Sequence, residues 1–84
     1  MNAIADILEA RGGRYGSFED QSKIAQQLKA VMQPHYHKLA PDMREALDHI
    51  SVKISRALNG DAEYVDHWRD IEGYAKLVAD RLAK

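Results

Sequence analysis

Apolar side chains recur at helical spacing through most of this chain and predict four helical segments. The clearest stripe follows Pro41, where successive apolar positions are four, three, four and three residues apart: Met43, Leu47, Ile50, Ile54 and Ala57. This spacing places them on one face of a helix, which we expect to be buried. No segment shows the alternating pattern typical of a strand. The sequence therefore predicts an all-α fold, a compact bundle of three to four helices.

Capping and helix-breaking residues set the expected boundaries of the first two helices. Asn2 is a candidate N-cap of the first helix, and Gly12 and Gly13 are expected to end it. Residues 14–16 then form a tight loop. Ser17, with Asp20 three positions later, is expected to begin the second helix as an acidic variant of a capping box.

Proline and glycine set the later boundaries. Pro34 disfavours helix in the residue before it, so the second helix is expected to end there. Pro41 suits the first turn of the third helix, and Asn59-Gly60 is expected to stop it. The fourth helix is expected to start near Asp61 or Glu63.

The other three helices also carry apolar faces that we expect to be buried. These positions are Ala3, Ile4, Ile7 and Leu8 in the first helix; Phe18, Ile24, Leu28, Val31 and Met32 in the second; and Tyr64, Trp68, Ile71, Ala75, Val78 and Leu82 in the fourth. His67 is expected to pack toward the core. Trp68 and Tyr74 are expected to be core aromatics, with stacking on a ligand base as the alternative.

Length and composition limit the classes of function. A chain of 84 residues forms one domain, residues 1–84, and buries only about 60% of its unfolded surface. It has no cysteine, so oligomerisation is the remaining route to more buried area, and we expect a homo-oligomer. Twelve basic against thirteen acidic residues argue against a nucleic-acid partner. With no membrane span or signal peptide apparent, we expect a cytoplasmic protein with no membrane partner.

Two acidic pairs are the leading candidates for chemistry. Glu45 and Asp48 are three apart on the third helix, and Asp66 and Asp70 are four apart on the fourth. Such pairs share a helix face, so antiparallel helices would let them converge on a magnesium ion, which prefers oxygen ligands. The alternative is a solvated surface with ordinary helix ion pairs.

Basic residues supply candidate phosphate contacts. Lys53 and Arg56 lie three apart on the polar flank of the third helix, and Arg14 and Tyr15 lie in the glycine-flanked loop. An arginine grips phosphate with paired hydrogen bonds. The alternatives are solvated charges and a loop in which Tyr15 packs as a plug.

Nearly the whole chain resembles a small domain of unassigned function common in phages and prophages. Four segments carry this resemblance: Arg14-Tyr15-Gly16-Ser17-Phe18, Arg44-Glu45-Ala46-Leu47, Lys53-Ile54-Ser55-Arg56 with Asn59-Gly60-Asp61, and Trp68-Arg69-Asp70-Ile71-Glu72-Gly73-Tyr74-Ala75. More distantly, that domain is similar to the MazG-like all-α nucleoside triphosphate pyrophosphohydrolases.

Those enzymes bind magnesium through a Glu-x-x-Glu pair on one helix and a Glu-x-x-Asp pair on the next. Glu45-x-x-Asp48 matches the first pair conservatively, and His67-x-x-Asp70 matches the second with histidine in place of an acid. Asp66 would substitute one position earlier. The resemblance thus implies a metal role for Glu45, Asp48, Asp66 and Asp70, with Glu45 and Asp70 as catalytic residues.

Two functions follow from this resemblance. The first is a phage-type, magnesium-dependent enzyme that releases pyrophosphate from a nucleoside triphosphate, with Arg14, Tyr15, Lys53 and Arg56 binding substrate. The alternative is an accessory protein without catalysis that sequesters a nucleotide or a nucleotide-derived small molecule, or binds a host protein.

Overall fold

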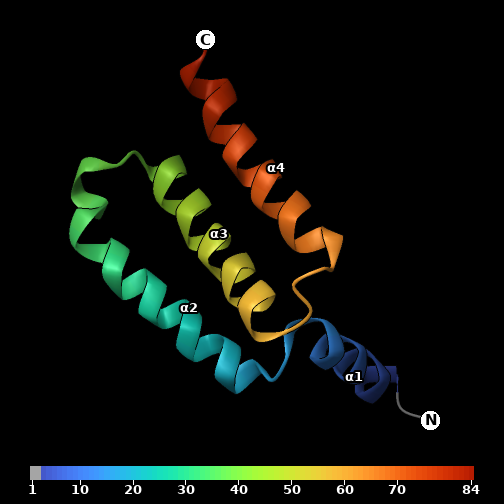
Figure 1. Cartoon of the computed structure of the whole chain (residues 1–84). Helices are drawn as coiled ribbons and strands as arrows, with labels where there is room; N and C mark the ends of the chain where they lie inside the picture. Colours follow the sequence, from blue (N-terminus) through green and yellow to red (C-terminus); the bar gives the residue numbers. More distant parts are fainter. Residues whose placement is uncertain (1–2) are drawn as a thin grey trace.

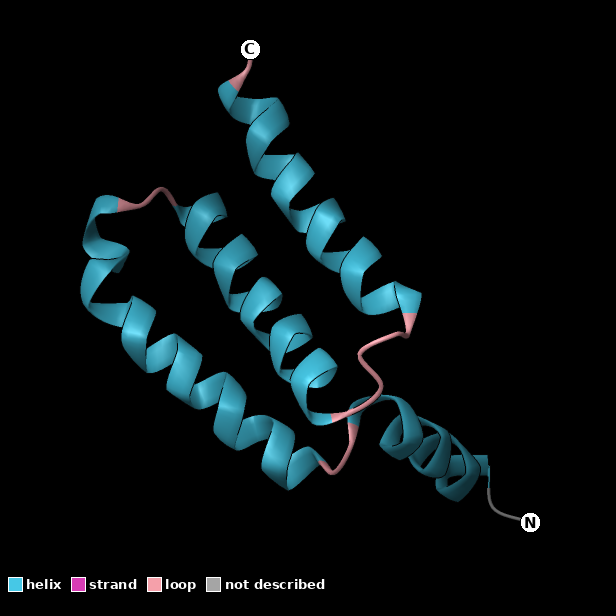
Figure 2. Ribbon diagram, in the orientation of Figure 1, coloured by secondary structure: helices cyan, strands magenta, loops and turns pink. Residues whose placement is uncertain are grey.

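The computed structural model describes residues 3–84, which form four α-helices and one 3₁₀ helix (Figure 2). The elements are α1 (Ala3–Tyr15), α2 (Phe18–Met32), η1 (Gln33–Lys38), α3 (Pro41–Asn59) and α4 (Val65–Leu82). No strand occurs in this part of the chain. The predicted all-α class is therefore confirmed.

The helix α3 lies at the centre of the arrangement. It packs against α2 on one side and α4 on the other, while α1 projects from the end where α3 stops (Figure 1). The molecule measures 49 × 26 × 22 Å and has a radius of gyration of 14.6 Å. A compact domain of this length has a radius of gyration of about 12 Å. The chain is thus more extended than a closed bundle.

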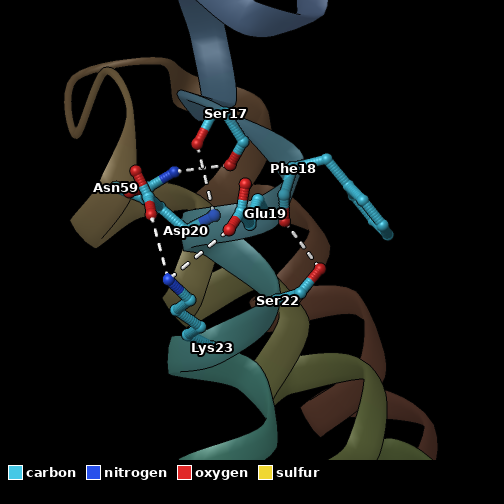
Figure 3. A network of polar contacts seen from close by, with 7 residues as sticks. All are labelled: Ser17, Phe18, Glu19, Asp20, Ser22, Lys23 and Asn59. Carbon is cyan, nitrogen blue, oxygen red and sulfur yellow. Dashed lines mark hydrogen bonds and ion pairs between the residues drawn. The ribbon is translucent and has the colours of Figure 1, made fainter.

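Several expected helix boundaries are confirmed. The Ser17 hydroxyl accepts a hydrogen bond of 3.2 Å from the Asp20 amide and caps α2 (Figure 3). Pro34 lies just beyond the end of α2, and Pro41 is the first residue of α3. The helix α3 ends at Asn59, as expected. The proposed cap at Asn2 lies outside the described residues.

Two expected boundaries are wrong. The helix α1 does not end at Gly12 and Gly13 but continues to Tyr15, so Arg14 and Tyr15 are helical. The stop is Gly16, whose φ of 75° lies in the left-handed region and whose amide donates to the Gly12 carbonyl at 2.8 Å. Glycine adopts this conformation without steric cost, which explains why the third glycine, rather than the first two, ends the helix.

The start of α4 also differs. It begins at Val65 rather than at Asp61 or Glu63. The Asp61 carboxylate accepts a hydrogen bond of 3.0 Å from the Glu63 amide, which holds residues 61–64 in a turn. A short acidic side chain competes with helix in this way.

A polar corner fastens α1 to the end of α3. The Asn59 side-chain amide donates to the Tyr15 carbonyl at 2.9 Å and to the Ser17 carbonyl at 3.0 Å, and so bridges the two helices on either side of Gly16. Figure 3 shows the bond to Ser17. The Asp61 amide donates to the Arg14 carbonyl at 2.8 Å. A side chain at Gly60 would put its first carbon 2.2 Å from that same carbonyl oxygen, so only glycine fits.

Small side chains form the buried interior. The buried residues of α2 and α3 are Gln21, Ala25, Ala46, Ser51, Ser55 and Ala57. The Gln21 amide donates to the Ser55 hydroxyl at 2.8 Å, and that hydroxyl donates to the Val52 carbonyl at 2.6 Å. These bonds satisfy the polar groups at the α2–α3 contact, where an unpaired group would be costly.

Most of the apolar faces that were expected to be buried are not. In the α3 stripe only Ala57 is buried, and the other four residues are half-buried. Large side chains on the other helices are exposed: Ile4, Ile7, Leu8, Phe18, Val31, Trp68 and Leu82. The physical reason is that α2 and α4 flank α3 along its length while α1 contacts it less, so part of the surface of α3 stays open.

The aromatic expectations for α4 are corrected in part. Trp68 is 56% exposed, and its indole N–H donates to the Ala62 carbonyl at 2.8 Å. Tyr74 is half-buried and stacks on His49 with ring centres 4.5 Å apart. His67 is buried, as expected. Among the described helices, none has the length and apolar character needed to cross a membrane.

The glycine at the α1–α2 corner gives a matched test of this architecture. Gly16→Ala should lower the free energy of unfolding by about 1–3 kcal/mol, because alanine disfavours positive φ and its methyl group would lie 2.3 Å from the Asn59 carbonyl oxygen. Gly13→Ala is the control, since its methyl group would meet nothing within 4 Å. That change should stabilise α1 by up to about 1 kcal/mol. Urea denaturation followed by circular dichroism at one protein concentration measures both, and equal effects would contradict the assignment.

Candidate functional site

The acidic residue Asp70 lies at the contact between α3 and α4. Its carboxylate forms an ion pair of 3.1 Å with Lys53, whose side chain is only 16% exposed. The other end of the same contact is joined by Asp42 and Arg81, with a hydrogen bond of 2.8 Å from Arg81 Nη2. The hydrogen bond from Arg81 lowers the pKa of Asp42 below its ordinary value. Lys53 and Asp70, predicted to bind phosphate and metal, thus tie two helices together.

The other three candidate carboxylates each have a separate partner. Asp48 accepts a hydrogen bond from the Tyr36 hydroxyl of η1, and Asp66 accepts one of 2.7 Å from Tyr64. Glu45 lies 3.6 Å from His49, its neighbour one helical turn away. Within residues 3–84, no three histidine, aspartate or glutamate side chains gather where they could hold a metal ion. One copy of the chain therefore does not bring the predicted magnesium ligands together.

The aromatic side chains at the corner between α1 and α4 form a cluster. The Tyr15 ring centre lies 5.5 Å from that of His67 and 6.5 Å from that of Tyr64, and the latter two are 5.2 Å apart. The His67 ring nitrogen Nε2 lies 3.3 Å from the Arg14 carbonyl oxygen. Because a carbonyl only accepts, Nε2 carries the hydrogen in this contact. The cluster fixes the Tyr15 ring against the end of α4.

Three arginines surround this cluster. The guanidinium carbons of Arg56 and Arg11 lie 4.4 and 5.6 Å from the Tyr15 ring centre, and that of Arg14 lies 4.9 Å from the Tyr64 ring centre. A cation over an aromatic face is attracted by the negative charge of the ring face. None of the three arginines lies within 4.0 Å of a carboxylate in the described part of the chain. Arg56 Nε is buried and has no hydrogen-bond partner within residues 3–84.

A pocket of about 500 Å³ opens beside these arginines, where α1, α2 and α3 meet. Its lining residues are Leu8, Arg11, Gly12, Tyr15, Gly16, Ser17, Phe18, Gln21 and Arg56. Its volume lies within the roughly 300–1,000 Å³ usual for small-molecule sites. The lining contains two arginines and no acidic residue, so it favours an anion. Phe18 is 80% exposed and leaves an aromatic face free beside the charges.

Of the four predicted substrate-binding residues, Tyr15 and Arg56 line this pocket. Arg14 belongs to the adjacent cluster, whereas Lys53 pairs with Asp70 elsewhere. Sequence reasoning missed Arg11, Phe18 and Gln21. Arg11 and Tyr15 are four residues apart, so they share a helix face if the helix continues through Gly12 and Gly13. This spacing is the signal that could have identified Arg11.

Comparison with known proteins gives no match, whether with protein families, curated proteins or solved structures. The resemblance to the phage domain and to the MazG-like enzymes therefore stays a prediction.

The Lys53–Asp70 pair gives a test of the structural role of Asp70. Asp70→Asn should lower the free energy of unfolding by about 1–2 kcal/mol, because it leaves a half-buried ammonium group without its partner. Asp80→Asn is the matched control, since Asp80 pairs with Lys76 at 2.8 Å and both side chains are exposed. Its loss should cost about 0.5 kcal/mol at most. Equal unfolding midpoints for the two variants in urea would disprove the structural role.

The contact between η1 and α3 gives a pH prediction. The hydrogen bond to Asp48 raises the pKa of the Tyr36 hydroxyl to about 12 from its ordinary value of 10.0. The folded state holds this proton more tightly, so the contribution to stability is complete below pH 10 and is lost as the pH rises through about 12. The ultraviolet titration difference between the wild type and Tyr36→Phe should show this ionisation near pH 12. In the Asp48→Asn background it should move toward the ordinary value, and no movement would contradict the assignment.

Proposed function

We propose that the chain binds a nucleotide, or a related aromatic ligand bearing phosphate, in the pocket between α1, α2 and α3. One observation carries this proposal: Arg11 and Arg56 both lie over the Tyr15 ring in a pocket with no acidic residue. This corresponds to the sequestering function predicted from the sequence. Binding at this site needs no metal ion.

The phosphate part of the ligand is supported by charge. Guanidinium groups form paired, charge-assisted hydrogen bonds with phosphate oxygens, and those of Arg11 and Arg56 have no competing carboxylate among the described residues. The pocket also includes Ser17 and Phe18, at the N-terminus of α2. A helix N-terminus presents partial positive charge and favours an anion.

The aromatic part of the ligand is supported by the exposed side chain of Phe18. A benzyl group that is 80% exposed offers a ring face on which a nucleobase can stack. The Tyr15 ring is already covered by the arginines, which leaves Phe18 for this role. A ligand with both a base and phosphates would engage both ends of the pocket.

The magnesium-dependent release of pyrophosphate that the sequence predicts would also require a metal site. In the described part of one copy, the carboxylates at positions 45, 48, 66 and 70 lie with separate partners. A metal site would therefore have to combine carboxylates from two copies. Hydrolysis is tested in the same experiment as binding.

Equilibrium dialysis of the purified chain against labelled nucleoside triphosphates and monophosphates, with magnesium or with a chelator, tests the proposal. Binding of at least one nucleotide in the chelator arm is expected. Arg56→Met should weaken it about 10-fold or more, the usual cost of losing a charge-assisted hydrogen bond. This variant also removes a buried Nε that has no hydrogen-bond partner among the described residues, so the fold should persist.

Arg69→Met is the control, because Arg69 lines a different hollow on α4. Its nucleotide affinity should equal that of the wild type. If no nucleotide binds, or if Arg56→Met and Arg69→Met bind alike, the proposed site is wrong and a host-protein partner becomes the better hypothesis. Release of pyrophosphate that requires magnesium and is lost in Asp70→Ala would establish the enzymatic prediction instead.

A further inference from the structure

The two neighbours of α3 leave one of its faces only partly covered. Toward α4, α3 presents Asp42, His49 and Lys53, which contact Arg81, Tyr74 and Asp70. Toward α2 and η1 it presents Asp48 and Ser55, which contact Tyr36 and Gln21. At 100° per residue, one complete stripe falls between these two sides. The middle of that stripe is apolar and consists of Met43, Leu47, Ile50, Ile54 and Leu58, while Ser51 and Arg44 lie at its border with the α2 side.

The helix α4 extends this surface on one side of α3. A groove of about 350 Å³ between the two helices has no charged residue in its lining: Leu39, Met43, Ala46, Leu47, Ile50, Ala75 and Val78. Helical spacing places Trp68, Ile71 and Leu82 on the same flank of α4 as Ala75. Leu77 lies on the opposite flank, in a hollow with Arg69 and Asp70.

The helix α2 extends the surface on the other side of α3. Its residues Ile24, Leu28 and Val31 occupy one flank of the contact with α3, and Phe18 occupies the other. Phe18 and Arg56 line the same pocket, and Arg56 lies on the side of α3 opposite the apolar stripe. The other flank of α2, which carries Ile24, therefore lies on the same side of the helical layer as that stripe. We call the whole surface the apolar face: Ile24, Leu28, Val31, Met43, Leu47, Ile50, Ile54, Leu58, Trp68, Ile71, Ala75, Val78 and Leu82.

The chain exposes more surface than a monomeric protein of its mass, and the excess is as large as the area that a protein–protein interface buries. The chain exposes 6141 Å², whereas a monomeric protein of 9.5 kDa exposes about 5,000 Å². The excess of roughly 1,100 Å² is larger than the about 800 Å² that each partner buries in a standard stable interface. The buried hydrophobic residues in the described chain are only Ala25, Ala46 and Ala57. The chain thus lacks the second layer against which a layer of helices normally buries its apolar side.

We infer that this second layer is another copy of the chain, packed face to face across a two-fold axis near the middle of α3. The apolar face suits this partner because α3 lies at its centre with α2 and α4 on either side (Figure 1). A rotation about that centre lays the same apolar residues against each other, as an isologous dimer requires. The α3 stripe and the groove carry no charge that such a rotation would place against its own copy.

A pair of substitutions at exposed positions tests this dimer by sedimentation equilibrium. The wild type should have twice the 9.5 kDa mass of the chain. Val31→Lys combined with Leu58→Lys should weaken the dimer about 100-fold or more, because charged groups would be buried in the interface. Leu77→Lys is the matched control: Leu77 is 68% exposed and Leu58 is 69% exposed, but Leu77 lies outside the apolar face. The control should remain dimeric.

Disulfide trapping tests the same surface without disturbing the charge. The chain has no cysteine, so a single introduced cysteine can pair only with its copy. Under mild oxidation, at least one of Leu47→Cys, Ile50→Cys and Ile54→Cys should give a covalent dimer, and Leu77→Cys should not. A wild type that stays monomeric at all concentrations, or crosslinking at Leu77 alone, overturns the inference. Nucleotide affinity is a separate readout, because the pocket lies on the other side of the layer.

Discussion

The structure depends on how closely α3 approaches its neighbours through small side chains. Alanine at positions 46 and 57 and serine at positions 51 and 55 are buried on α3, and Ser55 is hydrogen-bonded to Gln21 on α2. Small side chains let helices approach but enclose little volume. The large apolar residues of α3 are consequently left beside the contacts rather than inside them, and the apolar face follows from this arrangement.

The polar corner at the end of α3 depends on the same helix. Asn59 holds the carbonyls of Tyr15 and Ser17, and Gly60 allows the Arg14 carbonyl to approach. This attachment fixes the last turn of α1 beside Arg56. Without it, the arginines of α1 and α3 would not share one pocket. Asn59 and Gly60, neither of which lines the pocket, therefore position the proposed ligand-binding residues.

The two sides of the helical layer then have different chemistry. One side carries the aromatic cluster, the arginines and the ion pair of Lys53 with Asp70, and the other carries the apolar face. Exposed apolar residues on this scale are unusual on a monomeric protein and mark a surface that another molecule covers. The division is already present in α3, where polar and apolar residues alternate with helical period. The proposed ligand site and the inferred dimer interface thus lie on separate surfaces.

The sequence by itself determined the helices, because apolar spacing, the Ser17 cap, Pro34, Pro41 and Asn59-Gly60 act over a few neighbouring residues. It also indicated that His67 packs inside and that Arg56 and Tyr15 belong to a candidate site. Only the tertiary structure decided that Asp70 pairs with Lys53, that Gly16 rather than Gly12 ends α1, and that the stripe of α3 stays partly exposed. These three features depend on which helices are neighbours in space. The helical period predicts on which face of a helix a residue lies, but it does not predict which other helix packs against that face.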